Sequence, residues 1–236
     1  MAHKIYPVEI KVNVAGPAAD ALSALELAGG SSRQIWFLED LTPGFEPALP
    51  LLAAGVLLRL RRGQSDDSTI KLRPCRRTQL PPEWTDKIVS GDAFEYRVEA
   101  DWTGERRSLA ASAVRELEQG LIGDVTLDGA DPGLLFDRRQ QDFIRSCADF
   151  RVAFGGLTPL GPIEATKWKK VAIGEFETNV ERWTVGSLDF LEVSIRSEDN
   201  PEQHQHRFES AIRAAGLTID DSPDSKTRRV LVELTA

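Results

Sequence analysis

Cysteine and histidine are scarce in this chain of 236 residues, which contains two cysteines and three histidines. Cys75 and Cys147 stand far apart and form none of the close spacings that bind zinc or carry redox chemistry. We therefore expect two reduced thiols in the protein core. His204 and His206 stand two positions apart in a predicted helix, where they cannot face the same way, so no zinc site is predicted there.

Long apolar runs are missing as well. No segment approaches the roughly 18 consecutive apolar residues of a membrane-spanning helix. Residues 1–13 contain no apolar core of the kind found in signal peptides. We therefore expect a cytoplasmic protein with no membrane partner.

The chain also lacks an excess of basic residues and two familiar catalytic motifs. Lysine and arginine total 29 against 37 aspartates and glutamates, which gives a net charge of −8, so nucleic acid is not the expected partner. Neither the G-x-S-x-G turn of serine hydrolases nor the G-x-x-x-x-G-K-[ST] phosphate loop occurs, which disfavours both classes. The sequence leaves a homodimer open.

What the chain does contain is apolar residues that alternate with polar ones, the period of a β-strand. About eight strands are predicted on this pattern, at 8–14, 33–40, 56–62, 69–73, 93–102, 160–170, 174–184 and 188–197. Helices are predicted after Pro17 and at 106–119, 131–148 and 200–215, with a last element at 228–234. A regular β-α-β rhythm is absent, so we expect an α+β protein with an antiparallel sheet.

The two strand-rich halves must pair with each other to complete such a sheet. We therefore expect one domain over residues 1–236, with a helical segment at about 103–158 between the halves.

One face of most predicted strands is unusually rich in charge. In 56–62, Leu58 and Leu60 share one face while Arg59 and Arg61 share the other, because side chains alternate along a strand. The strand at 69–73 presents Lys71 and Arg73 in the same way. Other strands present carboxylates on the charged face, namely Glu9, Glu99, Asp101 and Glu192.

Two interpretations fit this pattern. A sheet with one face on helices and the other in water gives the same alternation, and such a protein would be an interaction scaffold. If instead the sheet closes with its charged face inward, the charges require partners, because an uncompensated buried charge is costly. A triphosphate with a divalent cation supplies both signs, and hard oxygen ligands suit Mg²⁺ or Mn²⁺.

Several segments resemble, in order, the strand motifs of the CYTH family, also called triphosphate tunnel metalloenzymes, which includes thiamine triphosphatases and CYTH-type adenylate cyclases. Residues 7–11 (PVEIK) resemble its E-x-E-x-K motif, with Pro7 in place of the first glutamate. The remaining matches are 36–40 (WFLED), 54–61 (AGVLLRLR), 69–73 (TIKLR), 97–101 (RVEAD) and 191–195 (LEVSI).

The resemblance implies a closed antiparallel tunnel with helices packed outside, and hydrolysis of inorganic triphosphate, thiamine triphosphate or a nucleoside triphosphate with a divalent metal. It implies that phosphate is bound by Lys11, Arg59, Arg61, Lys71, Arg73, Arg97, Lys167 and Lys169. It implies metal ligands at Glu9, Glu99, Asp101 and Glu192, and catalytic roles for Glu9, Lys11 and Glu99.

Two departures from the family pattern matter. Pro7 and Ser194 each stand where the family often has a carboxylate. An alternative function is therefore a binding module that holds a polyphosphate or phosphorylated ligand without cleaving it.

Overall fold

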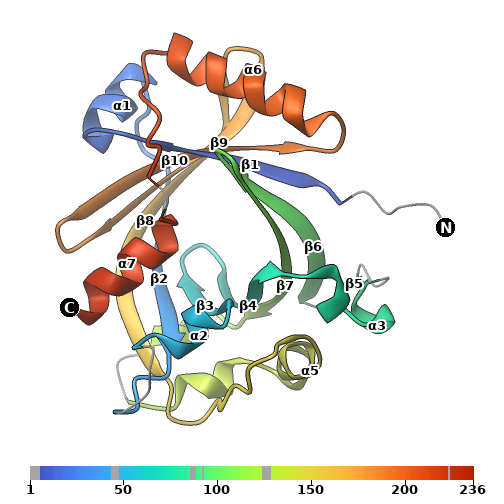
Figure 1. Ribbon diagram of the computed structural model, residues 1–236. Helices are drawn as coiled ribbons and strands as arrows, with labels where there is room; N and C mark the ends of the chain where they lie inside the picture. The colour runs from blue at the N-terminus through green and yellow to red at the C-terminus, as the bar shows by residue number, and fades with distance from the viewer. Residues whose placement is uncertain (1–5, 44–47, 86–88, 92, 124–128, 223) are drawn as a thin grey trace.

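Ten β-strands and a set of short helices make up the computed structural model, which describes residues 6–43, 48–85, 89–91, 93–123, 129–222 and 224–236 (Figure 1). Nine of the strands form a closed ring in the order β1-β10-β9-β8-β2-β3-β4-β7-β6. They are β1 (Val8–Val14), β2 (Ser31–Glu39), β3 (Val56–Arg62), β4 (Asp66–Cys75), β6 (Phe94–Thr103), β7 (Arg106–Leu117), β8 (Thr158–Ile173), β9 (Phe176–Val185) and β10 (Leu188–Ser197).

Neighbouring strands in the ring are antiparallel except where β1 pairs with β6 in parallel and closes it. The short strand β5 (Val89–Gly91) extends β6 beyond the ring. The expected α+β barrel of about eight strands is thereby confirmed, with a ninth strand and one parallel pair added.

The helices lie around this ring. They are α1 (Ala18–Ala24), α2 (Pro50–Ala53), α3 (Pro82–Thr85), α5 (Arg138–Cys147), α6 (Pro201–Ala214) and α7 (Lys226–Thr235), with 3-10 turns η1 (Arg77–Gln79) and η2 (Pro132–Leu135). Local signals fix their starts: Asp137 and Gln140 form a reciprocal cap on α5, and Ser225 caps α7. In the described part of the chain, no helix is long and apolar enough to cross a membrane.

The predicted helix at 106–119 is wrong, because these residues form strand β7 between β4 and β6. Alanine-rich sequence favours a helix locally, but the ring needs a strand here, and tertiary pairing overrides propensity. The small side chains suit this position, because Ser112 stands opposite both Lys71 and Arg97 and leaves room for them. Within the expected helical segment at about 103–158, described helical elements include η2 and α5, whereas residues 124–128 lie outside the description.

Apolar side chains form two clusters on the outer face of the ring. One packs α5 against β3, β4, β6 and β7, with Phe143 and Tyr96 in its centre. The other packs α1 and α6 against β1, β9 and β10, with Phe208 fully buried. Figure 1 shows α5 and α6 on opposite sides of the ring. Much of the outer face is thus apolar and covered by helices, and the strand faces that carry most of the charge are left for the interior.

A third apolar cluster lies on the inner face, at one end of the ring. It includes Phe37, Leu57 and Trp183 from the strands, and α7 covers them with Val230 and Leu231. Helix α7 therefore covers apolar residues at one end of the tunnel, and the charged residues occupy the remainder.

Candidate functional site

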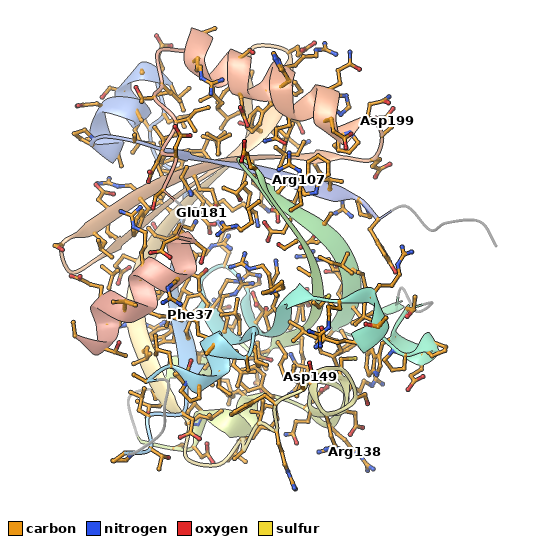
Figure 2. The ribbon with its side chains drawn as sticks, in the orientation of Figure 1. Phe37, Arg107, Arg138, Asp149, Glu181 and Asp199 are labelled. Atoms are coloured by element: carbon orange, nitrogen blue, oxygen red, sulfur yellow. The ribbon has the colours of Figure 1, made fainter. Side chains whose placement is uncertain are left out.

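The ring encloses a cavity of about 170 Å³, enough by this measure for roughly ten water molecules. Its lining contains nine cationic side chains and five carboxylates, an excess of four positive charges. The cations are Lys11, Arg59, Arg61, Lys71, Arg73, Arg97, Arg106, Lys167 and Lys226, and the carboxylates are Glu9, Glu99, Asp101, Glu181 and Glu192. Figure 2 shows Phe37 and Glu181 in the interior, while Arg138 and Asp199 lie at the outer surface.

Most residues expected in the site from the sequence do line this cavity. The structure brings together Glu9, Lys11, Arg59, Arg61, Lys71, Arg73, Arg97, Glu99, Asp101, Lys167 and Glu192. The charged faces of most strands in the ring therefore point inward, which excludes the half-exposed sheet.

Lys169 is the exception: its side chain is exposed and it does not line the cavity. Lys167 and Lys169 would share a face in a regular strand. However, the pairing of β8 with β9 shifts register between Trp168 and Val171, and Lys170 adopts a left-handed backbone conformation with φ 58°. This irregularity ends the regular alternation just after Lys167, so the expectation that Lys169 binds phosphate in the cavity is wrong for this structure.

Asp101 is the centre of the densest ion-pair network. Its Oδ2 lies 3.0 Å from Lys11 Nζ, 3.0 Å from Arg73 Nη1 and 3.4 Å from Lys71 Nζ, and its side chain is 5% exposed. Burial alone would raise the pKa of Asp101, but Lys11, Lys71 and Arg73 together hold this pKa far below its ordinary value. Asp101 is therefore ionised at any physiological pH.

The two lysines of this network differ in their electrostatic surroundings. Lys11 Nζ lies 2.8 Å from Glu9 Oε2. Burial alone would lower the pKa of Lys11, but Glu9 and Asp101 raise it above its ordinary value. Lys71 shares its carboxylates with other cations, so burial and then Lys11 lower the pKa of Lys71. Lys11 is thus a fixed cation, whereas Lys71 would gain from an additional anion.

Arg59 has no carboxylate within 4.0 Å among the described residues. One guanidinium nitrogen donates a hydrogen bond of 3.3 Å to Thr69 Oγ1, and Nε is buried without a partner. The neighbouring Arg61 takes the nearby carboxylate, with its Nε 2.8 Å from Asp67 Oδ2. Burial, and next the charge of Arg61, lower the pKa of Arg59 to about 9. This arginine is a cation in the tunnel wall that lacks an anion.

Sequence reasoning missed several residues of the lining. Glu181 lies on β9, where polar residues occupy both faces of the strand, so alternation gives no clear direction. Arg106 begins β7, which was predicted as a helix. Lys226 and Thr227 come from the first turn of α7, and no sequence pattern indicates that this turn enters the barrel.

The carboxylates do not form a preformed metal site. No cluster of three or more Asp, Glu, His or Cys side chains suited to a metal occurs among the described residues. Each carboxylate of the lining instead lies within 4.0 Å of a lysine or arginine. Mg²⁺ commonly binds through one or two carboxylates plus substrate phosphate oxygens. Glu9, Glu99 and Asp101 can therefore supply oxygen ligands to a divalent ion only when phosphate oxygens of the substrate complete its coordination.

No family model matches the chain, and no curated protein sequence matches it. Solved structures do match. A candidate adenylyl cyclase from Hippeastrum, described as having a dominant triphosphatase activity, shares 16% sequence identity at a TM-score of 0.62, with 96% of each chain covered. A candidate adenylate cyclase from Bacillus halodurans shares 13% identity at a TM-score of 0.58, with 97% of this chain and 98% of that chain covered. The chain therefore has, over nearly its whole length, the closed-tunnel fold that its resemblance to the CYTH family predicts.

Proposed function

We propose that the tunnel binds a triphosphate or polyphosphate and hydrolyses its terminal phosphoryl group with a divalent cation, Mg²⁺ or Mn²⁺. Arg59 carries the proposal, because a cation in the tunnel wall with no carboxylate partner requires an anion to balance it. The excess of four positive charges in the lining points the same way. The triphosphatase activity described for the similar Hippeastrum protein supports the choice of phosphate chemistry.

A phosphate chain matches the lining in charge. Arginine binds two phosphate oxygens at once, and lysine binds as a point charge. Arg59 and Lys167 would bind first, because neither has a carboxylate within 4.0 Å in the described structure, and burial lowers the pKa of both. Lys71 would follow, since a nearby phosphate raises its lowered pKa back towards the ordinary value.

The reaction that fits this lining is attack of water on the terminal phosphorus, with cleavage of the bridging P–O bond. Lys11, Arg73 and Arg97 would hold the phosphoryl oxygens and stabilise their charge. Burial alone would raise the pKa of Glu9, but Lys11 and Lys71 keep this pKa below its ordinary value. The Glu9 carboxylate would therefore accept a hydrogen bond from the attacking water and, together with Glu99, orient it. When bound, the divalent ion would be held by Glu9, Glu99 and Asp101 and would neutralise charge on the transferred phosphoryl group.

Phosphate release from inorganic triphosphate, thiamine triphosphate and nucleoside triphosphates, each with Mg²⁺ or Mn²⁺, tests the proposal. We expect metal-dependent release from at least one substrate. Arg59→Ala and Lys71→Ala should each reduce kcat/KM by tenfold or more, since each removes a charged contact to phosphate. Full activity in both variants would rule out the site.

A second function, binding without hydrolysis, is favoured by one observation. The described carboxylates of the lining are all paired with protein cations and form no cluster that could hold a metal by itself. Calorimetry that shows tight triphosphate binding, with no phosphate released under any metal condition, would support this function. Measurable metal-dependent turnover would reject it.

A further inference from the structure

Glu181 and Glu192 stand directly opposite each other on β9 and β10, and both line the cavity. Like charges in directly opposite positions repel and destabilise a sheet. Asn13 stands opposite Glu192 on the other neighbouring strand, β1, and its buried Oδ1 has no hydrogen-bond partner. These three residues form a row of oxygen-bearing side chains across three adjacent strands, which we call the oxygen row.

Lys226 lies on the oxygen row. Its Nζ is 3.2 Å from Glu192 Oε1 and 3.8 Å from Glu181 Oε2, and its side chain is 7% exposed. The same nitrogen lies 4.0 Å from the ring centroid of Trp183, so one side of the ammonium group faces an aromatic surface. Lys226 is the first residue of α7, and the apolar cluster around Val230 and Leu231 holds this helix in place.

We propose that Lys226 is a tethered cation that occupies the position where the oxygen row would otherwise bind a divalent ion. Carboxylate and amide oxygens are ligands that suit Mg²⁺ and Mn²⁺. The ammonium group lies within 4.0 Å of both carboxylates and repels a second cation. Ions are thereby restricted to the Glu9, Glu99 and Asp101 end of the tunnel, and Glu192 is excluded as a metal ligand.

Other cations near the oxygen row do not replace Lys226. Lys167 and Arg59 act on Glu181 through their charge, and Lys11 acts on Glu192 in the same way. Among the described residues, however, neither glutamate has any ion-pair partner within 4.0 Å except Lys226. Removal of this one ammonium group therefore leaves the two opposite carboxylates without a bridging cation.

Mn²⁺ titration of the folded protein without phosphate, read by electron paramagnetic resonance, tests the inference. We expect Lys226→Ala to bind one more Mn²⁺ ion than wild type, at least tenfold more tightly than any wild-type site. Lys226→Arg should behave as wild type because it keeps the charge. Arg228→Ala is the matched control, since Arg228 is exposed on the same helix and pairs with Asp224. Equal Mn²⁺ binding by Lys226→Ala and wild type would overturn the inference.

A second variant keeps the test decisive if Lys226→Ala does not fold. Glu192→Gln retains the shape of the side chain and leaves Lys226 paired with Glu181. We expect it to bind Mn²⁺ in the presence of triphosphate with the wild-type stoichiometry and affinity, and loss of a bound ion would contradict the inference. The inference rests on the proposed function, because it assumes that the tunnel binds a divalent ion together with phosphate. Its tests measure ion binding rather than hydrolysis, so failure of one does not imply failure of the other.

Discussion

Lys11 and Asp101 meet where the barrel closes: Lys11 Nζ lies 3.0 Å from Asp101 Oδ2, although 90 residues separate them in the sequence. They lie on β1 and β6, the one parallel pair of the ring. The ion pair therefore joins the first strand to the middle of the chain, at the same place where the densest charge network forms. The strand pair that closes the barrel thus also positions two central residues of the site.

Asp101→Asn should be strongly destabilising, because it leaves Lys11, Lys71 and Arg73 without their shared carboxylate. We expect the free energy of unfolding to fall by about 3–5 kcal/mol. Added triphosphate should restore part of this loss, since it supplies the missing negative charge. Urea denaturation with and without triphosphate measures both effects.

Asp189→Asn is the control for this variant. Asp189 pairs with Arg182 through two hydrogen bonds of 2.8 Å, but the pair is partly exposed on the outer face of the barrel. Such a pair contributes about 1 kcal/mol or less. A loss in Asp101→Asn no larger than in Asp189→Asn would refute the central position of Asp101.

Lys167→Ala and Lys169→Ala should separate a tunnel residue from a surface residue on one strand. Lys167 lines the cavity, whereas Lys169 is exposed beyond the register shift. We expect Lys167→Ala to weaken triphosphate binding by about tenfold, the effect of one charged hydrogen bond, and Lys169→Ala to leave it unchanged. Calorimetry on the two variants measures this difference. Equal effects would contradict the assignment of Lys167 to the tunnel and Lys169 to the surface.

Stability at acid pH should depend on Glu181. Burial alone would raise the pKa of Glu181, but Lys226, Lys167 and Arg59 outweigh burial and lower it from 4.5 to about 2. A lowered carboxylate pKa stabilises the fold fully above pH 4.5, and this contribution is lost as the pH falls towards 2. Glu181→Gln should therefore remove up to about 3 kcal/mol of the acid-induced loss.

The melting temperature of wild type and Glu181→Gln between pH 5 and about 2 tests this pH dependence. Glu175→Gln serves as the control, because Glu175 is exposed and pairs with Arg207 at the surface. Identical acid profiles for wild type and Glu181→Gln would show that the tunnel cations do not act on this carboxylate.

Alternation along the strands was sufficient to predict much of the fold. Leu58 and Leu60 face the outer core while Arg59 and Arg61 face the cavity, as the period of two requires. Alternation does not say which face closes inward, and the expectation of a closed tunnel came from the resemblance of the strand segments to the CYTH motifs. The strand β7 was missed because its alanines favour a helix locally, whereas in the barrel the small side chain of Ser112 leaves space for Lys71 and Arg97.

The site was predictable only where its residues lie on regular strands. Lys169 was misplaced because a register shift depends on pairing with β9, which the sequence of β8 alone does not encode. Lys226 was missed because the docking of α7 depends on an apolar cluster assembled from distant strands. Long-range packing of this kind leaves no local pattern in the sequence.

Triphosphate binding by Arg59→Met tests the central claim most directly, because Arg59 is the tunnel cation with no carboxylate within 4.0 Å in the described structure and with a buried, unpartnered Nε. We predict that the affinity falls by tenfold to a hundredfold, the equivalent of about 1.5–3 kcal/mol, while the melting temperature does not fall. Arg62→Met is the control, since Arg62 lies on the same strand but stacks over Trp36 outside the cavity. Wild-type affinity in Arg59→Met would contradict the account.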